Sequence, residues 1–461
     1  FALLVGVLLV ELLLPAFNQL AAKELSLMTD LLGSVGSGNI LLIIGFSLLI
    51  GLLSGMFPAF ILSRFQALHI AGKDFWHLKG KGTNRFSAGL RKSLVVFQFM
   101  VTAAMIIATL IVVSQMRFMR SRDLGFDKEH VLVIEIPSDR KVHEQLDAIK
   151  TEMGQLPEVK DASLCSDFPG FNHTRLTFYI EQEEGKYRQE MINLFRVDEN
   201  FANMLGIDMV EGRFFSTEYP SDPTSSFVVN KAAREIFGDS PLGQRMACGW
   251  GVRGEIIGVT DDFNYSSLHN PIEPLVYIYT PGRASYVALK IQSENIPSTL
   301  RSVEKTWKKF DNRHPYIYSF LDQQFNEQYQ QEEKLLTLFG YFSFLTIFLA
   351  CLGLFGLAAF MAERKRREIG IRKVMGSSAG LIVRSFLKVY TKWVIVANII
   401  AWPVAYYLMD RWLQNFAYRT EINWYLFAAA AGITLLLAVL TVSYHALRTA
   451  NTDPARVLRD E

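Results

Sequence analysis

Apolar residues are gathered in long blocks at the two ends of the chain, and the stretch between these blocks is polar. A helix needs about 20 apolar residues to cross the hydrocarbon core of a membrane. The pattern predicts six spans, at residues 1–17, 40–62, 94–113, 335–361, 393–409 and 424–444. Glu11 in the first span and Pro403 in the fifth argue against a membrane helix, because a buried carboxylate is costly and proline frees a carbonyl.

The polar stretch has the mixed periodicities of a folded domain. The segment 141–157 has helical periodicity, and so has 298–310. Segments rich in β-branched and aromatic residues predict strands at 130–137, 159–169, 175–182, 226–230, 254–260 and 286–292. We therefore expect an α+β domain with two lobes. The flanking segments 112–120 and 321–336 predict helices that extend beyond the spans as a stalk.

Composition agrees with a membrane protein that carries a soluble insert. The chain has 461 residues, of which 50% are hydrophobic and 13% aromatic, with a formal net charge of +2. A soluble chain of this length would divide into domains with alternating apolar patterning, not apolar blocks. The expected fold is a polytopic α-helical membrane protein with an inserted α+β domain.

Lysine and arginine are distributed unequally among the connecting segments. Residues 63–92 and 362–384 each carry seven, whereas the segments 18–39 and 410–423 carry one and two. Connecting segments rich in these residues stay in the cytoplasm. This bias places both basic segments and the C-terminal tail in the cytoplasm, and the polar domain outside.

The second basic segment contains a pattern that charge alone does not explain. Its sequence "AERKRREIGIRKVMGSS" (362–378) follows an uncharged run, interleaves apolar residues with cations over 369–375, and ends on a glycine and two serines. A topology anchor explains the charge. A short amphipathic helix on the membrane surface explains the order of the residues as well, and a soluble partner can bind such a helix.

Five segments resemble one protein family. "EIGIRKVMGSSAGLIVRSFLKVY" is similar to the hallmark cytoplasmic segment of FtsX/MacB-like ABC transporter permeases, and "CLGLFGLAAFMAERKRREIGIRK" is similar to the junction that leads into it. "NTDPARVLRDE" resembles the C-terminal motif of the family. "LFRVDENFANMLGIDMVEGRFFS" and "IIGVTDDFNYSSLHNPIEPLVY" resemble signatures of its external domain, the MacB-like periplasmic core. The resemblance covers most of residues 93–461.

The resemblance implies the permease subunit of an ABC transporter in the bacterial inner membrane. A separate ATPase dimer would bind the cytoplasmic segments, and its closure would move the external domain by mechanotransmission. The cargo would be a lipoprotein, a peptide or a similar molecule, with a periplasmic adaptor as a further partner. No cofactor and no nucleic acid is expected. The residues expected to contact the ATPase are Glu368, Gly370, Ile371, Arg372, Lys373 and Gly376.

An internal repeat suggests the domain organisation. Residues 54–73 and 441–460 both end a span and turn into a basic exit, so the first two spans correspond to the last two. Residues 1–72 would then be the end of a truncated first permease unit. The remaining segments are a linker (73–92), a span (93–115), the external domain with its stalk (116–334), a three-span permease domain (335–447) that includes the coupling segment 362–384, and a tail (448–461).

Catalytic and metal-binding motifs are incomplete. The sequence has no G-x-x-x-x-G-K-[ST] loop for ATP phosphates, and His143-Glu144 lacks the second histidine of a zinc-protease helix. The spacing of residues 376–380 fits a nucleophile elbow, but no strand precedes it. Cys165 and Cys248 lie in the external domain, and their spacing does not settle whether they form a disulfide. A receptor with an external ligand-binding domain and a membrane enzyme remain as alternatives.

Overall fold

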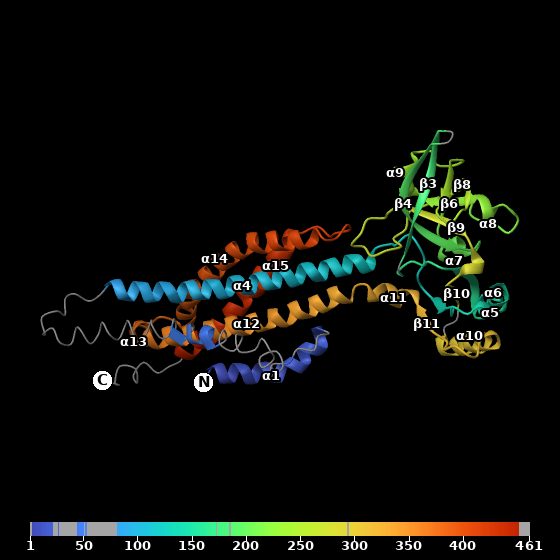
Figure 1. The fold of residues 1–461 in the computed structure, drawn as a ribbon. Coiled ribbons are helices and arrows are strands. Elements are labelled where there is room, and N and C mark those ends of the chain that lie inside the picture. Colours follow the sequence, from blue (N-terminus) through green and yellow to red (C-terminus); the bar gives the residue numbers. More distant parts are fainter. Residues whose placement is uncertain are drawn as a thin grey trace. The chain divides into compact units, whose positions relative to one another are not determined.

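A computed structural model describes residues 2–21, 26, 44–49, 51–52, 81–171, 173–183, 186–292 and 295–450 (Figure 1). The chain forms two compact units. The membrane unit comprises Phe1–Ile111, Lys334–Leu408 and Ile422–Glu461, and the α+β unit comprises Val112–Glu333 together with Met409–Glu421.

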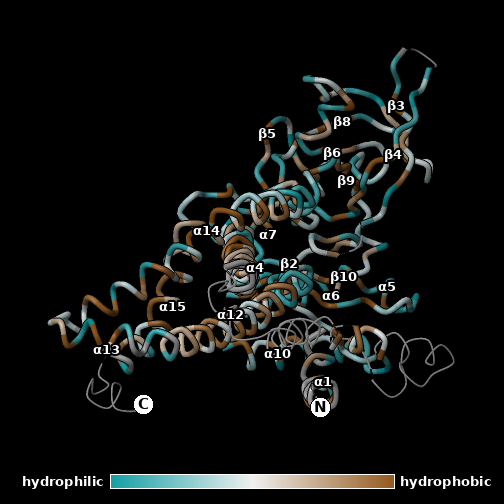
Figure 2. The backbone as a smooth tube through the Cα atoms, turned by 90° about the vertical axis from the view of Figure 1, so that its left-hand side faces the viewer, coloured by the Kyte–Doolittle hydropathy of each residue, from teal (hydrophilic) through white to brown (hydrophobic). Residues whose placement is uncertain are grey.

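Four helices of the described residues are long and apolar enough to cross a membrane. They lie at Lys92–Ser121, Gln330–Glu363, Gly380–Leu413 and Trp424–Arg448, and they confirm the last four predicted spans. Figure 2 shows hydrophobic residues recurring along α14 and α15. The first predicted span falls on a helix, α1 (Ala2–Ala21). The second, at 40–62, lies outside the described residues except for 44–49 and 51–52.

The spanning helices are longer than the apolar blocks that predicted them. These helices are α4 (Lys81–Ser121), α12 (Gln330–Arg364), α14 (Ala379–Leu413) and α15 (Trp424–Ala450). A short helix, α13 (Arg366–Val374), lies between α12 and α14 in the sequence. Pro403 lies inside α14 without ending it. Residues 379–392, which precede the predicted span at 393–409, form the first part of α14.

Small residues at intervals of four allow the helices of the membrane unit to pack closely. In α12 the buried stripe is Ala350, Leu354, Ala358 and Ala362. A Cβ atom on Gly353 would lie only 2.5 Å from Oε1 of Gln98 on α4. Without a hydrophobic driving force between helices in lipid, such close packing and interhelical hydrogen bonds hold a bundle together.

Hydroxyl and amide side chains add hydrogen bonds between these helices. Thr109 Oγ1 on α4 lies 2.9 Å from Ser343 Oγ on α12. Asn398 Nδ2 on α14 donates to Thr434 Oγ1 on α15 at 3.0 Å, and both side chains are buried. These pairs fix the rotation of each helix about its axis, because a slipped helix would leave a buried polar group without a partner.

The α+β unit contains one mixed sheet. Its strands are β1 (Val131–Glu135), β2 (Val159–Cys165), β3 (Thr174–Glu183), β4 (Lys186–Val197), β5 (Met209–Gly212), β6 (Ser226–Asn230), β7 (Arg245–Cys248), β8 (Arg253–Thr260), β9 (Leu275–Tyr279), β10 (Tyr286–Ile291) and β11 (Tyr318–Phe320). The strand order is β11-β1-β10-β2-β4-β3-β7-β8-β6-β9, with β5 paired to β8. Its short helices are α5 (Arg140–His143), α6 (Leu146–Gly154), α7 (Phe201–Leu205), α8 (Asp222–Ser225), η2 (Lys231–Ala233), α9 (Arg234–Phe237), η3 (Pro281–Arg283), α10 (Ile296–Phe310) and α11 (Leu321–Glu327).

The sheet has two parts, each with its own core. In the first part, β11, β1, β10 and β2 pack against α6 and α10, and the buried Trp307 of α10 belongs to this core. In the second part, β9 pairs in parallel with β4 and closes β4, β3, β7, β8, β6 and β9 into a ring. Phe178 and Phe227 lie in the core of this ring. The parts meet where Cys165 of β2 pairs with Val197 of β4.

One of the two predicted stalk helices is interrupted. α4 continues without a break to Ser121, as predicted, but α11 ends at Glu327 and α12 begins at Gln330. The two residues between them form hydrogen bonds with other segments of the α+β unit. Gln328 Nε2 donates to the carbonyl of Gly170 at 2.8 Å, and the hydroxyl of Tyr329 accepts from the backbone N–H of Leu268 at 3.2 Å. The helix predicted over 321–336 was wrong at this point.

Candidate functional site

The basic segment that resembles a coupling segment folds as the helix α13, and a glycine ends it. Gly376 has φ +91°, and the N–H of Gly376 donates to the carbonyl of Lys373 while that of Ser377 donates to Arg372. These two bonds satisfy carbonyls at the end of the helix, in an arrangement that needs a left-handed residue. Glycine adopts this conformation without steric strain, so Gly376 sets the turn from α13 into α14.

One face of α13 is buried inside the membrane unit. Ile369 is 6% exposed and belongs to the same core as Ala358 of α12 and Ala446 of α15. Gly370 is buried as well. Gly370 was predicted to contact the ATPase, but the structure places it on the side of α13 that packs within the chain.

The opposite face of α13 is exposed and partly apolar. Ile371 is 48% exposed, Val374 66% and Met375 82%, and their spacing of three and four residues puts them on one side of the helix. Arg372 and Glu368 form an ion pair on this surface at 2.6 Å. Of the six predicted contact residues, Glu368, Ile371, Arg372 and Gly376 are exposed and Lys373 is half-buried. We name Ile371, Val374 and Met375 the exposed face of α13.

A second candidate site lies in the α+β unit, where the segment between α14 and α15 packs. The backbone N–H of Ala417 donates to the carbonyl of His269 at 3.0 Å. On α4, the fully buried amide of Gln115 donates to the carbonyl of Tyr418 at 2.9 Å and accepts from the N–H of Thr420 at 2.8 Å. The nitrogen and the oxygen of one side-chain amide thus both form hydrogen bonds with the segment 415–420. We name this set of contacts the joint.

His269 lies at the centre of the joint. Its Nε2 lies 2.9 Å from a carboxylate oxygen of Glu332, and its Nδ1 lies 3.4 Å from the carbonyl of Asn415. Its ring stacks on Phe416 with the ring centres 4.3 Å apart. Both ring nitrogens face acceptors, so the charged imidazolium, which donates from both, fits this geometry best. The hydrogen bond to Glu332 raises the pKa of His269 above its usual 6.5.

The residues of the joint come from four separate segments of the chain, and none was predicted as a site residue. Gln115 on α4, His269 after β8, Glu332 on α12 and Phe416 after α14 become neighbours only in the folded unit. One signal was present in the sequence. Gln115 is a polar residue on the buried stripe of an apolar helix, and such a residue needs a partner.

The other candidate chemistry is simpler in the structure. Within the described ranges, no group of three or more His, Cys, Asp or Glu residues is arranged to hold a metal ion. Cys165 on β2 and Cys248 on β7 are buried and unbridged. Burial raises the pKa of the Cys165 thiol, which keeps this thiol protonated and unreactive.

Two family models match the two kinds of unit in the chain. The model of the MacB-like periplasmic core domain matches residues 99–306, and that of the FtsX-like permease C-terminal domain matches residues 340–454. The chain belongs to the FtsX/MacB-like permeases. The match to the second model includes α13. This permease is the membrane subunit of an ABC transporter, and its family implies an ATPase partner.

Relatives of this permease are distant in sequence. It is 21% identical over 298 residues to the uncharacterized ABC transporter permease YknZ of Bacillus subtilis, covering 61% of this chain and 74% of that protein. The periplasmic region of MacB from Actinobacillus actinomycetemcomitans matches at 12% identity with a TM-score of 0.33, covering 43% of this chain and 92% of the other. The extracellular domain of YknZ from Gram-positive bacteria matches at 18% identity with a TM-score of 0.29, covering 41% and 97%.

Proposed function

We propose that this permease couples ATP hydrolysis by a separate ATPase dimer to a movement of its α+β unit, which exports or extracts a lipoprotein, a peptide or a similar cargo. In this proposal the chain has no catalytic role, α13 lies in the cytoplasm and the α+β unit lies outside the bacterial inner membrane. The proposal rests chiefly on the exposed face of α13.

The exposed face of α13 has the properties of a docking surface. Three apolar side chains in water are unfavourable unless a partner covers them, and the basic residues beside them limit which partners bind. The buried face of α13, through Ile369, fixes the helix to the core of the membrane unit. A movement of a partner bound to the exposed face would therefore be transmitted to that core.

The chain also offers a route by which a movement at α13 can reach the joint. α12 precedes α13 and is one helix from Gln330 to Arg364, and its first turn carries Glu332 of the joint. α14 follows α13 and ends at Leu413, shortly before Phe416 of the joint. Helices are stiff along their axes, so a shift of α13 would change the distance or angle between these two ends. The joint is where the α+β unit would receive that change.

Replacing Val374 with aspartate tests the docking surface. A charge in the middle of the exposed face should weaken binding of the ATPase by about 1–3 kcal/mol if this valine is a central contact, or roughly 5- to 150-fold. The measurement is the amount of ATPase that co-purifies with the chain in mild detergent at matched expression. Val210→Asp is the matched control, because Val210 is an exposed valine in the α+β unit.

Gly370→Leu is a less informative change than the sequence alone suggested. Since Gly370 is buried, a leucine there would disturb the packing of α13 inside the chain as well as the binding of any partner.

The Val374→Asp experiment has two outcomes that contradict the proposal. Recovery of equal amounts of ATPase with wild-type and Val374→Asp chains would show that α13 is not the docking site. Loss with both Val374→Asp and Val210→Asp would point to a general folding defect, and would equally remove the support for the proposal.

A further inference from the structure

The hairpin of β3 and β4 has an edge that no strand covers. β4 pairs with β3 from Lys186 to Leu194, but its pairing with β9 on the other side begins only at Asn193. Among the described residues, no other strand pairs with 186–192 on that side. In both Figure 1 and Figure 2 the hairpin extends beyond the neighbouring strands. An open edge presents unpaired N–H and C=O groups to which another strand can be added.

One face of this edge carries two exposed apolar side chains, whereas its other face carries charges. Tyr187 is 55% exposed and Met191 is 63% exposed, and they lie on the same face because they are four residues apart in a strand. Proteins normally protect an exposed edge with charges or proline on such positions. Tyr187 and Met191 provide neither, so this face of the hairpin is suited to pairing with another strand.

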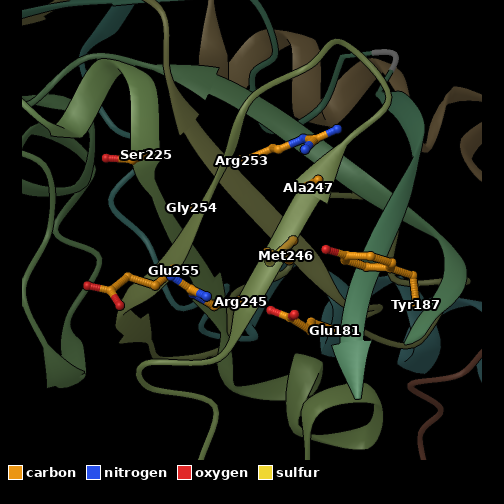
Figure 3. Close-up of a pocket in the computed structure, with 9 residues that line it drawn as sticks. All are labelled: Glu181, Tyr187, Ser225, Arg245, Met246, Ala247, Arg253, Gly254 and Glu255. Atoms are coloured by element: carbon orange, nitrogen blue, oxygen red, sulfur yellow. The ribbon is translucent and has the colours of Figure 1, made fainter. Parts of the chain in front are cut away.

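The ring of Tyr187 does not block the edge. Figure 3 shows this ring turned over the outer face of the sheet, toward Met246 and Ala247 of β7. There it borders a cleft of about 400 Å³, which Glu181 of β3 and Arg245 of β7 also line. Because the ring points over the sheet, the backbone of β4 stays accessible from the side.

The charges on β4 select the partner. Arg188 and Glu190 lie on the opposite face from Tyr187, 39% exposed each, with Arg188 Nε 3.2 Å from a Glu190 oxygen. We propose that this edge pairs with the same edge of a second copy of the chain, antiparallel about Gln189. This register places Arg188 opposite Glu190 of the other copy twice, and Tyr187 opposite Met191 twice.

The neighbouring registers are worse. In an antiparallel pair, residues opposite each other point to the same face of the sheet, and faces alternate along a strand. In a symmetric pair one residue must therefore lie opposite its own copy, with the two-fold axis midway between them. Centred on Arg188, the pairing would put two arginines opposite each other. Centred on Glu190, it would put two glutamates there. Like charges directly opposite destabilise a strand pair, so the register about Gln189 is the self-complementary one.

A contact of this size is weak between free molecules. It involves about five residues from each copy, well below a standard interface. Confinement of both copies to one membrane raises their effective concentration, so the contact forms there more readily than in dilute detergent. The experiment therefore uses the full chain in membranes.

A cysteine at position 189 tests the register. Strands in a sheet are about 4.8 Å apart, so the two Gln189 Cα atoms of a dimer lie within the range of a disulfide. Gln189→Cys should give a covalent dimer on mild oxidation. Tyr179→Cys is the control, because Tyr179 is the partner of Gln189 on β3 and would lie about three strand spacings from its copy. The unmodified chain gives the background from its own three cysteines.

Charge reversal shows whether the contact is between copies. In the Gln189→Cys chain, Arg188→Glu alone makes the edge acidic and Glu190→Arg alone makes it basic, and each should lower the dimer yield at least fivefold. Co-expression of the two variants should restore a mixed dimer, since every acidic residue then faces a basic one. The ion pair within each chain is lost in both variants, so only pairing between chains explains a recovery.

The possible outcomes separate clearly. A covalent dimer with Gln189→Cys but not Tyr179→Cys, lost on either reversal and restored by mixing, supports the proposal. No dimer with Gln189→Cys, or equal yields from both cysteines, overturns it. Dimers that survive both single reversals, or that mixing fails to restore, overturn the register and the choice of partner.

Discussion

Replacing His269 with glutamine should loosen the joint. The change removes the positive charge opposite Glu332 and the ring that stacks on Phe416, and leaves a carboxylate whose side chain is only 12% exposed. Breaking a fully buried ion pair costs about 3–5 kcal/mol. Because the His269 side chain is 30% exposed, we expect a smaller loss, about 2 kcal/mol. This corresponds to roughly a 30-fold increase in the open population of the segment 415–420.

Hydrogen exchange measures this population directly. The N–H groups of Ala417 and Thr420 donate to the joint, so they exchange when the segment opens. With the chain in lipid nanodiscs at pH 5.5, the peptide that contains them should exchange about 30-fold faster in His269→Gln. His143→Gln is the control, since His143 lies on α5 and takes no part in the joint.

The effect should depend on pH in one direction. The folded pKa of His269 is raised, so the stabilisation is fully present below 6.5 and is lost as the pH rises through the folded pKa. After correction for intrinsic exchange, wild-type protection should fall at high pH and approach that of His269→Gln. Equal exchange of both proteins at pH 5.5, or wild-type protection that increases with pH, would refute the charged state of His269 and its role.

Two further substitutions test packing inside each unit. Asp198→Asn should lower the free energy of unfolding of the α+β unit by about 3 kcal/mol, because Asp198 is fully buried and lies 2.7 Å from Lys150 Nζ. Glu152→Gln is the control, because it breaks an exposed ion pair, and it should change this free energy by less than about 1 kcal/mol in the same thermal melt. Gly353→Ala should lower the melting temperature of the membrane unit in detergent only slightly, by a cost below about 1 kcal/mol, because the end of the flexible Gln98 side chain can move away from the new Cβ atom. Gly356→Ala should leave it unchanged, because a Cβ atom there meets nothing within 4 Å. Equal effects within either pair would contradict the packing described.

The sequence predicted the features that depend on local pattern. Apolar blocks long enough to cross a membrane gave the last four spans, and β-branched segments gave strands such as β1 and β6. It did not predict β4, in which an exposed first half is followed by a second half that is buried by pairing with β9, a strand far along the chain. Period alone does not show such a change of environment within one strand.

The sites depend on contacts between distant segments, which pattern does not specify. The sequence located α13, but not its rotation, so it assigned Gly370 to a partner although this glycine is buried. The burial of one face is set by the core that Ile369 joins, together with residues of α4, α12, α14 and α15. The joint was missed for the same reason, since Gln115 and Tyr418 are neighbours only after the unit has folded.

The strand order of the first sheet part has a consequence for biosynthesis. β1, the first strand of the α+β unit, pairs with β10 and β11, the last two, so Leu132 lies between Leu289 and Phe320. Nearly the whole unit must therefore be synthesised before its first strand finds either neighbour. Such non-local pairing is slow to form and leaves strand edges open while the chain waits. Because α11 and α12 follow β11 at once, the membrane insertion of α12 coincides with the moment at which the sheet can close.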